Sequence, residues 1–281
     1  MKHHNFTALA AAGAIAALAA CSKTPAQEPA DTLHPVKFSV EALATEYGAL
    51  TKAGTAAEKI NVLSHKAKGA NPNYQYAVKA YTAEQLAALD LSALEVALPA
   101  GDYTVYFIAG GKDSTEPLYW DNSTITVATP RELYAGSVAG VNVQTAEEYT
   151  ATLQRVTGGL ALNITDLASA PANFTKVKLN FSRPTIWDPI AGTYTGSDTG
   201  GVELTAEEIA AGAYKSVFPF DARTIQVQVY RGTSIAASYS VSAAVYSNRK
   251  TIITGALFGG SAAFSVSVQD AWGDDNPVYI Q

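Results

Sequence analysis

The residue with the clearest chemistry is Cys21, the single cysteine of the 281-residue chain. It ends the run Leu18-Ala19-Ala20-Cys21, which has the form of a bacterial lipobox. Small side chains at Ala19 and Ala20 fit the narrow site of a signal peptidase, and the thiol supplies a nucleophile for diacylglycerol. We therefore predict cleavage between Ala20 and Cys21 and lipidation of Cys21. An ordinary signal peptide with a chance cysteine is the alternative.

The residues before Cys21 have the pattern of a secretory signal peptide. A short N-terminal segment with basic residues, Met1 to His4, precedes an apolar run from Phe6 to Ala20. This run is too short and too rich in alanine for a stable membrane span. No second run is long enough, so the acyl chains on Cys21 are the predicted membrane attachment. Each buried CH₂ group of such chains contributes about 0.8 kcal/mol.

Other residues that could do chemistry are scarce. His3 and His4 leave with the signal peptide and His34 lies at the end of a tether, so His65 is the one imidazole inside a predicted domain. A catalytic triad or metal site would have to be built around it without a cysteine. The chain also lacks a phosphate loop and an HExxH motif. We predict no enzyme activity, no cofactor and no metal, although residue types alone leave a paired-carboxylate glycosidase open.

Two further patterns have a functional and a structural interpretation. Asp270, Asp274, Asp275 and Asn276 crowd oxygen ligands as calcium sites do, but their spacing does not match an EF-hand and we favour a solvated loop. Each tryptophan lies near a turn and could stack on a sugar ring, but large aromatic side chains are mostly buried and we favour a role in the core. These residues are Trp120, Trp187 and Trp272.

The composition narrows the class of protein. A formal net charge of −6 gives no basic face for nucleic acid. A single cysteine excludes a disulfide framework, so burial alone must stabilise the fold. With 48% apolar residues the mature chain is long enough to form one or two domains.

The elements that must position these residues are mostly strands. Residues 21–35 are rich in proline and small polar residues and predict a flexible tether. After it, apolar residues alternate with polar ones in many short segments rich in Val, Ile, Thr and Tyr. Only 83–91 and 205–211 have a helical pattern, and glycine pairs such as Gly158-Gly159 favour hairpin turns. The pattern predicts antiparallel β-sandwiches.

The strongest break signal is Thr129-Pro130-Arg131. It divides the chain into an N-terminal β-sandwich, 36–130, and a C-terminal β-sandwich, 131–281. All six arginines lie at or after this break, which also agrees with chance.

Several motifs, none of them specific alone, follow one another in a consistent order along the chain. Through them the mature chain resembles Bacteroidales fimbrial proteins of the FimB/Mfa2 type, anchor-like relatives of the fimbrillins. The resemblance rests on the lipobox with the early strand Val36-Lys37-Phe38 and on four later segments. These are Leu98 to Tyr106, Glu132 to Gly136, Leu153 to Val156 leading into Leu160–Ile164, and Asn248 to Leu257 followed by Phe264–Trp272.

This resemblance implies two transthyretin-like β-sandwich domains and a non-enzymatic role in a fimbrium at the cell outer membrane. Subunits of such fimbriae join when one adds a β-strand to a groove in its neighbour. Shaft subunits generally lose an N-terminal segment to an arginine-specific protease, which opens that groove. The partners implied are other fimbrial subunits, with a host or glycan ligand left open.

The arginine distribution bears on this processing. Because no arginine lies between Cys21 and Thr129, the first strand should stay in place and the lipid should stay joined to the fold. This favours an anchor or minor structural subunit. The alternative is a surface glycan-binding lipoprotein with exposed aromatic side chains in line. The C-terminal residues Pro277 to Gln281 either close their own sheet, which we favour, or are donated.

Overall fold

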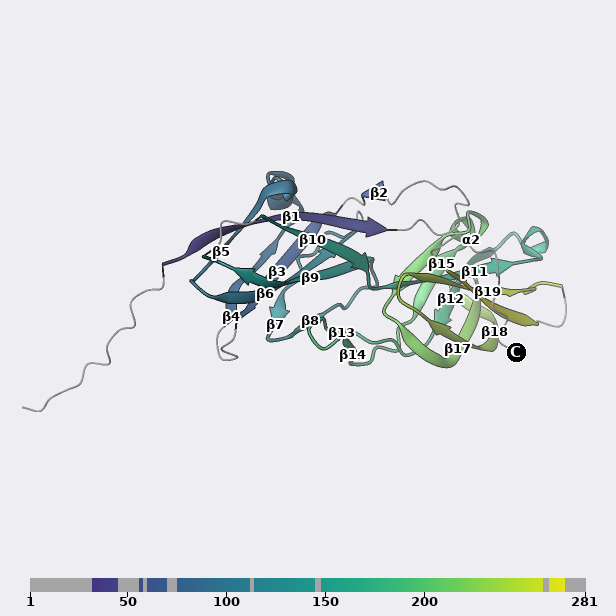
Figure 1. The fold of residues 1–281 in the computed structure, drawn as a ribbon. Coiled ribbons are helices and arrows are strands. Elements are labelled where there is room, and N and C mark those ends of the chain that lie inside the picture. The colour runs from purple at the N-terminus through teal and green to yellow at the C-terminus, as the bar shows by residue number, and fades with distance from the viewer. Residues whose placement is uncertain are drawn as a thin grey trace, which may run out of the picture. The chain divides into compact units, whose positions relative to one another are not determined.

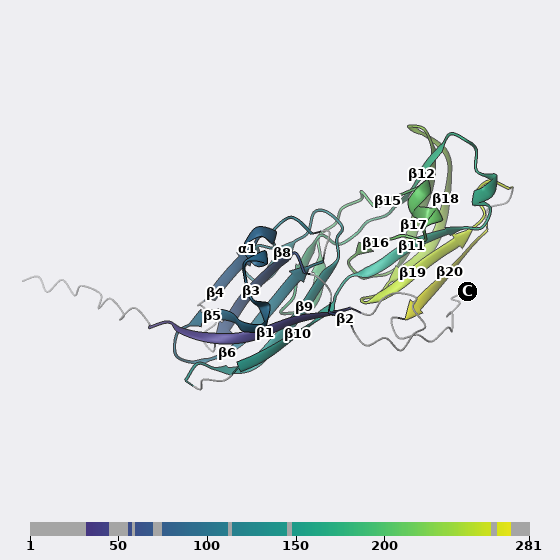
Figure 2. The ribbon, with the colours of Figure 1, turned by 90° about the horizontal axis from the view of Figure 1, so that it is seen from above.

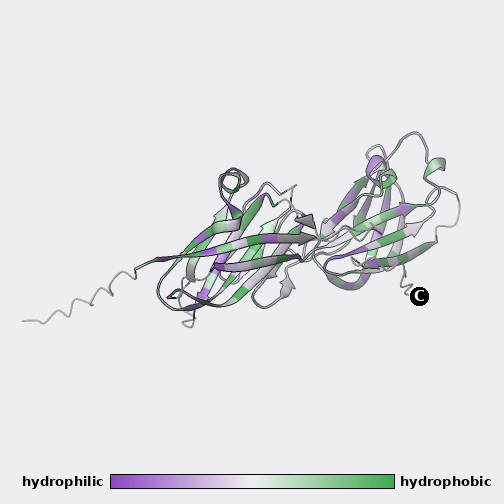
Figure 3. Ribbon diagram, turned by 45° about the horizontal axis from the view of Figure 1, so that its top comes forward, coloured by the Kyte–Doolittle hydropathy of each residue, from purple (hydrophilic) through white to green (hydrophobic). Residues whose placement is uncertain are grey.

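A computed structural model describes residues 32–44, 56–57, 60–69, 75–111, 114–144, 148–259 and 263–270. Almost all of its regular structure is β-strand, with two short helices, so the predicted all-β class is confirmed (Figure 1). Along the strands, hydrophobic and hydrophilic residues often alternate (Figure 3). This alternation places one face of each sheet toward a core. The described residues from Leu33 onward belong to one compact unit.

The first sheet has eight strands, in the order β2-β1-β10-β9-β6-β3-β4 with β5 paired to β1. Its two halves meet where β9 and β10 pair at only two positions, Ala135 with Gln154 and Tyr134 with Arg155. The strands are β1 (His34–Ala44), β2 (Ala56–Ala57), β3 (Val62–Gly69), β4 (Gln75–Tyr81), β5 (Leu94–Leu98), β6 (Asp102–Gly110), β9 (Leu133–Asn142) and β10 (Glu148–Arg155).

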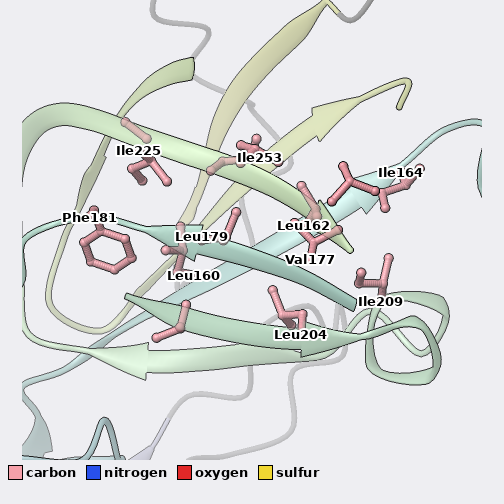
Figure 4. Close-up of a cluster of buried hydrophobic side chains, with 14 of the residues drawn as sticks. Leu160, Leu162, Ile164, Val177, Leu179, Phe181, Leu204, Ile209, Ile225 and Ile253 are labelled. Carbon is pink, nitrogen blue, oxygen red and sulfur yellow. The ribbon is translucent and has the colours of Figure 1, made fainter. Parts of the chain in front are cut away.

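Two four-stranded sheets surround a second core, in the orders β16-β11-β19-β20 and β15-β12-β17-β18. Side chains such as Leu160, Val177 and Ile253 point into it from different strands (Figure 4). The strands are β11 (Gly158–Ile164), β12 (Phe174–Asn180), β15 (Val202–Thr205), β16 (Tyr214–Val217), β17 (Phe220–Arg231), β18 (Ser234–Val245), β19 (Arg249–Gly255) and β20 (Phe264–Asp270).

The two cores repeat one topology. In each, the first strand pairs parallel with a late strand, β1 with β10 and β11 with β19. The remaining ladders also correspond, with β3, β4, β6 and β9 matching β12, β15, β17 and β18. These two parallel ladders depart from the antiparallel pairing predicted for every sheet. In the second core, β20 follows the shared strands in sequence and pairs with β19. The described residues of the first core include no such additional strand beside β10.

Both helices begin with the same cap. α1 (Ala83–Ala87) follows Thr82, and α2 (Ala206–Ala210) follows Thr205; each threonine forms a capping box with the residue three positions later. The reciprocal bonds satisfy backbone N–H groups that the first turn leaves free. Each helix buries one residue, Leu86 or Ile209, against its core. The two predicted helices are therefore confirmed, although both end earlier than predicted. Single 3₁₀ turns lie at Leu91–Ala93 and Leu167–Ser169.

A fourth sheet, small because its strands have two or three residues each, joins segments from either side of the predicted break. β13 (Ile186–Asp188) pairs with β8 (Thr124–Thr126), and β7 (Trp120–Asp121) and β14 (Thr193–Thr195) extend the sheet on either side. Around it lies a separate apolar cluster drawn from the first core, the second core and this sheet. Its buried members are Val62, Ile108, Leu118, Ile125, Val127, Leu133, Trp187 and Phe218.

The predicted break at Thr129-Pro130-Arg131 does not separate the two cores. β9 and β10 follow it, yet they pair with β6 and β1 and bury Tyr134, Ala151 and Leu153 in the first core. The chain passes to the second core after Arg155. Long-range pairing overrides the local proline signal here, because β9 and β10 complete the ladders of strands that precede the break.

One predicted turn is also a strand. Gly158 and Gly159 begin β11 rather than forming a hairpin turn. A Cβ atom at Gly158 would collide with the backbone oxygen of Tyr246. The missing side chain therefore allows two backbones to approach closely, which is a recognised use of glycine within strands.

Replacing Trp187 tests the apolar cluster around the small sheet. Its side chain is buried, with its ring stacked on Tyr194 at 6.3 Å and tilted against Phe218 at 6.0 Å. We expect Trp187→Ala to lower the free energy of unfolding by about 3–5 kcal/mol through lost contacts and a residual cavity. Trp187→Phe, the control, should lose clearly less. Urea denaturation measures both, and a loss below about 1 kcal/mol for the alanine variant would contradict this role.

Candidate functional site: the seat of the first strand

The first described strand lies inside its sheet rather than at an edge. β1 pairs parallel with β10 from Lys37 to Leu43 and antiparallel with β5 from His34 to Phe38 (Figure 2). β2 pairs with its end at Leu43 and Ala44. The strand begins at His34, slightly before the predicted end of the tether at Pro35.

Alternate side chains of β1 complete the first core. Val36, Phe38 and Val40 are buried, while Lys37 between them is exposed. The Phe38 ring meets Phe107 edge-on at 5.1 Å and stacks on Tyr149 at 5.7 Å. Tyr149 extends this contact to β9, because its hydroxyl accepts a hydrogen bond from the backbone N–H of Asn142 at 3.0 Å. Phe38 therefore ties together three strands.

Removing β1 would create a strand-shaped groove. The backbone groups of β10 and β5 that now pair with β1 would become open edges, and the pockets for Val36, Phe38 and Val40 would line the floor between them. Unpaired backbone groups with pockets at alternate positions are the elements that strand addition uses. In the structure this groove is filled by the chain's own β1.

The first two arginines of the chain are poorly accessible. The Arg131 side chain is 11% exposed, and its Nη1 donates a hydrogen bond to the backbone oxygen of Glu116 at 2.8 Å. Burial, partly offset by the Glu116 carboxylate, lowers the pKa of Arg131. The Arg155 side chain is 4% exposed, and its Nη2 lies 2.7 Å from Oε1 of Glu132. Both arginines precede the second core, so the arginine-free stretch is shorter than the first core.

The other residues singled out in the sequence do not converge. Cys21, Ala20, Trp272, Asp274 and Asp275 lie outside the described residues. Trp187 is buried in the cluster around the small sheet and Trp120 packs against it, as the core interpretation predicts. Within the described ranges, no group of three or more His, Cys, Asp or Glu side chains is arranged to hold a metal ion. No described helix is long and apolar enough to cross a membrane.

His65 lies in the first core. It is 2% exposed, with its ring 5.7 Å from that of Tyr81 and 6.0 Å from that of Phe107. Burial, and secondarily the positive charge of Lys79, lower its pKa to about 4. The imidazole is therefore neutral near pH 7 and packs as an aromatic side chain.

Sequence reasoning missed a cleft of about 620 Å³. Its lining carries charges of both signs, and two of its cations pair with acids: Lys215 with Glu208 at 2.6 Å and Arg131 with Glu116 at 3.9 Å. These residues are far apart in the sequence and follow no shared motif, so no local pattern could have revealed the cleft. Most of the charged side chains that line the cleft are therefore neutralised by one another, and no bound ligand is needed to balance them.

No protein-family model matches the chain, and no curated protein sequence matches it. Its fold does match solved structures from Bacteroidales. Putative polysaccharide binding proteins from Bacteroides thetaiotaomicron VPI-5482 are 14% identical, with a TM-score of 0.54 and coverage of 88% of this chain and 98% of that chain. The likeness at this identity shows a common fold.

Fimbrial proteins are also among the structural neighbours. The fimbrial anchor protein Mfa2 from Porphyromonas gingivalis is 11% identical, with a TM-score of 0.45 and coverage of 88% of this chain and 100% of that chain. A fimbrial assembly protein from Parabacteroides distasonis ATCC 8503 is also 11% identical, with a TM-score of 0.47 and coverage of 88% and 99%.

Truncating Phe38 tests whether β1 stabilises the first core. We expect Phe38→Ala to lower the free energy of unfolding by about 3–5 kcal/mol, because it empties the contact with Phe107 and Tyr149. Lys37→Ala is the matched control, since this neighbouring side chain is exposed. Chemical denaturation compares the two variants, and equal stabilities would show that β1 is dispensable for the core.

The buried His65 predicts a pH dependence of stability. Its folded-state pKa of about 4 lies below the unfolded value of 6.5, so the folded state binds fewer protons between these values. Its contribution to stability is fully present above pH 6.5 and decreases as the pH falls toward 4, by up to about 3 kcal/mol at 1.36 kcal/mol per pKa unit.

Denaturation at a series of pH values measures this slope. Carboxylates with lowered pKa values, such as Glu208 bonded to Lys215, lose their contribution below pH 4.5, so pH 4.5–6.5 isolates the histidine. His65→Gln should remove most of the slope within that window, whatever its own stability. An unchanged slope in this variant would assign the effect to other groups.

Proposed function

We propose that the chain is a cell-surface lipoprotein that acts as an anchor or minor structural subunit of a fimbrium and joins other subunits by β-strand addition. The observation that carries the proposal is the position of β1 between β10 and β5. A subunit that keeps this strand keeps its groove filled. It also keeps the fold covalently joined to whatever is attached at Cys21.

The energetics favour retention of β1. Its three inward side chains are almost completely buried, at 4%, 0% and 6% exposure for Val36, Phe38 and Val40. Fully burying an apolar side chain of this size contributes about 1.5–3 kcal/mol. Loss of the strand would remove these contacts and open two backbone edges. Only a strand from a partner would restore both.

The arginines support retention by a second route. A protease that recognises arginine must take the side chain into a pocket, and no arginine lies between Cys21 and Arg131. The next two side chains are held by Glu116 and Glu132 and are hardly exposed. Cutting at either would require local unfolding and would fall within or after the strands of the first core rather than after β1.

The repeated topology offers an element for joining a neighbour. β20 lies beyond the set of strands that the two cores share, and among the described strands it pairs only with β19. A terminal strand of this kind is suited to strand exchange, because the shared strand order is complete without it. The C-terminal residues Pro277 to Gln281 are still expected to close their own sheet rather than to be donated.

A surface glycan-binding lipoprotein is the second candidate. The solved proteins with the same fold from Bacteroides thetaiotaomicron are described as putative polysaccharide binding proteins. A stacking platform needs exposed aromatic side chains in line, and Trp187 is buried. The most exposed aromatic residues of the described chain, Tyr119 and Tyr246, lie in different segments of the chain, and neither belongs to a core cluster. The fimbrial role is therefore preferred.

The test is to isolate the mature protein from its own cells and to determine its N-terminal residue and the proteins that co-purify with it. We expect mass spectrometry to find a diacylglycerol-modified N-terminal peptide beginning at Cys21, and fimbrial subunits to co-purify with it. Cys21→Ser is the control and should release the protein from the membrane fraction. A start downstream of β1 would contradict the anchor role. Lipidated protein that binds glycans and copurifies with no fimbrial subunit would favour the second candidate.

A further inference from the structure

The sheets of this protein protect their edges, with one exception. Natural proteins block edge strands by keeping them short or by placing charges, proline or bulges on them. Among the described residues, the edge strands β15, β16 and β5 have five residues or fewer and carry Glu203, Lys215 and Glu95. β4 carries Lys79 and is interrupted by Ala77, whose φ is +48°. β20 is seven residues long and ends in Asp270.

β18 has none of these protections over most of its length. It runs for twelve residues, Ser234–Val245, without a charge, a proline or a glycine. It pairs with β17 on one side, and no other described strand pairs with its second edge. Its ladder with β17 shifts register at Ala236 and again between Ala243 and Val245, so the strand is regular from Ala237 to Ala243.

The ladder with β17 determines which backbone groups face away from it. The hairpin closes on the pair Arg231 and Ser234, and after the shift Ala237, Tyr239 and Val241 lie opposite alternate residues of β17. Residues between these positions direct their N–H and C=O groups to the other side, since pairing alternates along an antiparallel ladder. Ala244 has no partner in the ladder with β17, and its backbone oxygen accepts a hydrogen bond from the Thr251 hydroxyl at 2.8 Å. Ser238, Ser240 and Ser242 present the remaining open groups.

The side chains at this edge suit close approach of a second strand. Ser238, Ser240 and Ser242 are exposed and small. Ser240 is held by Gln226 of β17, whose Nε2 donates to its hydroxyl at 2.9 Å. On the opposite face, Tyr239 packs against Phe264 of β20 with ring centroids 5.7 Å apart. The core side of β18 is therefore covered while its backbone edge is open.

We propose that this edge is a strand-pairing surface and that its occupant is β18 of a second copy of the chain. Antiparallel pairing of β18 with itself opposes no like charges, because the strand has none. A register centred on Ser240 places Ser238 opposite Ser242 and Tyr239 opposite Val241, so the inward and outward faces of both strands match.

Self-pairing also explains why such an edge is tolerated. A contact in which the same surface meets itself about a two-fold axis closes after two copies, whereas pairing with a different edge could continue into a filament. One strand pair buries less surface than a standard stable interface, so the dimer is weak in dilute solution. Confinement at one surface would raise the effective concentration of its partners.

The test uses residues 22–281, which include the whole compact unit, in sedimentation velocity over a concentration series. We expect a monomer–dimer equilibrium. Ser240→Pro removes an outward N–H group and should raise the dissociation constant at least tenfold, whereas Ser240→Ala, which loses the hydroxyl but keeps the N–H, should leave it within twofold. Thermal unfolding of both variants separates lost pairing from lost folding.

A charge swap gives a second measurement that leaves the backbone unchanged. Ser240→Lys and Ser240→Glu should each be monomeric because like charges meet at the two-fold axis, and an equimolar mixture should form a mixed dimer. Hydrogen exchange should show protection of the Ser238, Ser240 and Ser242 amides that rises with concentration. A monomer at every concentration, or a dimer that survives Ser240→Pro, would overturn the proposal. Protection that is independent of concentration and is lost when 271–281 are deleted would also overturn it, by assigning the edge to the chain's own tail.

Discussion

The pairing of β1 on both of its edges is the constraint on which the first core depends. Terminal segments are poorly ordered unless pairing or packing holds them, and here β10 and β5 both bond to β1. The parallel ladder with β10 pairs the first strand of this core with its last. The chain segment from β1 to β10 therefore forms one continuous structural unit. Phe38 adds the side-chain contact that holds these strands against β6. The strand nearest the predicted lipid is thus among the most integrated of the molecule.

The second core shows the same constraint and one addition. β11 occupies the position of β1 and is paired on both edges by β19 and β16. Where β9 meets β10 directly in the first core, β20 lies beside β19 in the second. The two cores therefore share a strand order but differ in the strand that lies beside β10 or β19. β20 is therefore an addition to the strand order that both cores share. A search for sequence repeats would not reveal this, because the two cores share strand order rather than motifs.

Local signals in the sequence predicted most of the elements but not their grouping. Alternating apolar residues predicted a chain made mostly of short strands, including the early strand at Val36 to Phe38 that is now β1, and the threonine caps agree with both helices. The predicted break failed because proline at position 130 reports a turn and carries no information about which sheet the next strand joins. Gly158 failed for a related reason, since its role depends on the backbone of Tyr246, almost ninety positions away in the chain. The arginine pattern was visible in the sequence, but the burial of Arg131 and Arg155 depends on partners that folding brings together.

Burial of Arg155 contributes to the pairing that closes the first core. An ion pair as buried as that with Glu132 adds little net stability, since the cost of desolvating both charges offsets their attraction. Leaving either partner alone would be costly, however, so the pair penalises any register of β9 and β10 that separates them. Tyr134 strengthens this selection, because its ring lies 5.6 Å from the guanidinium. The geometry that fixes the seam between β9 and β10 is therefore the same geometry that keeps this arginine away from solvent.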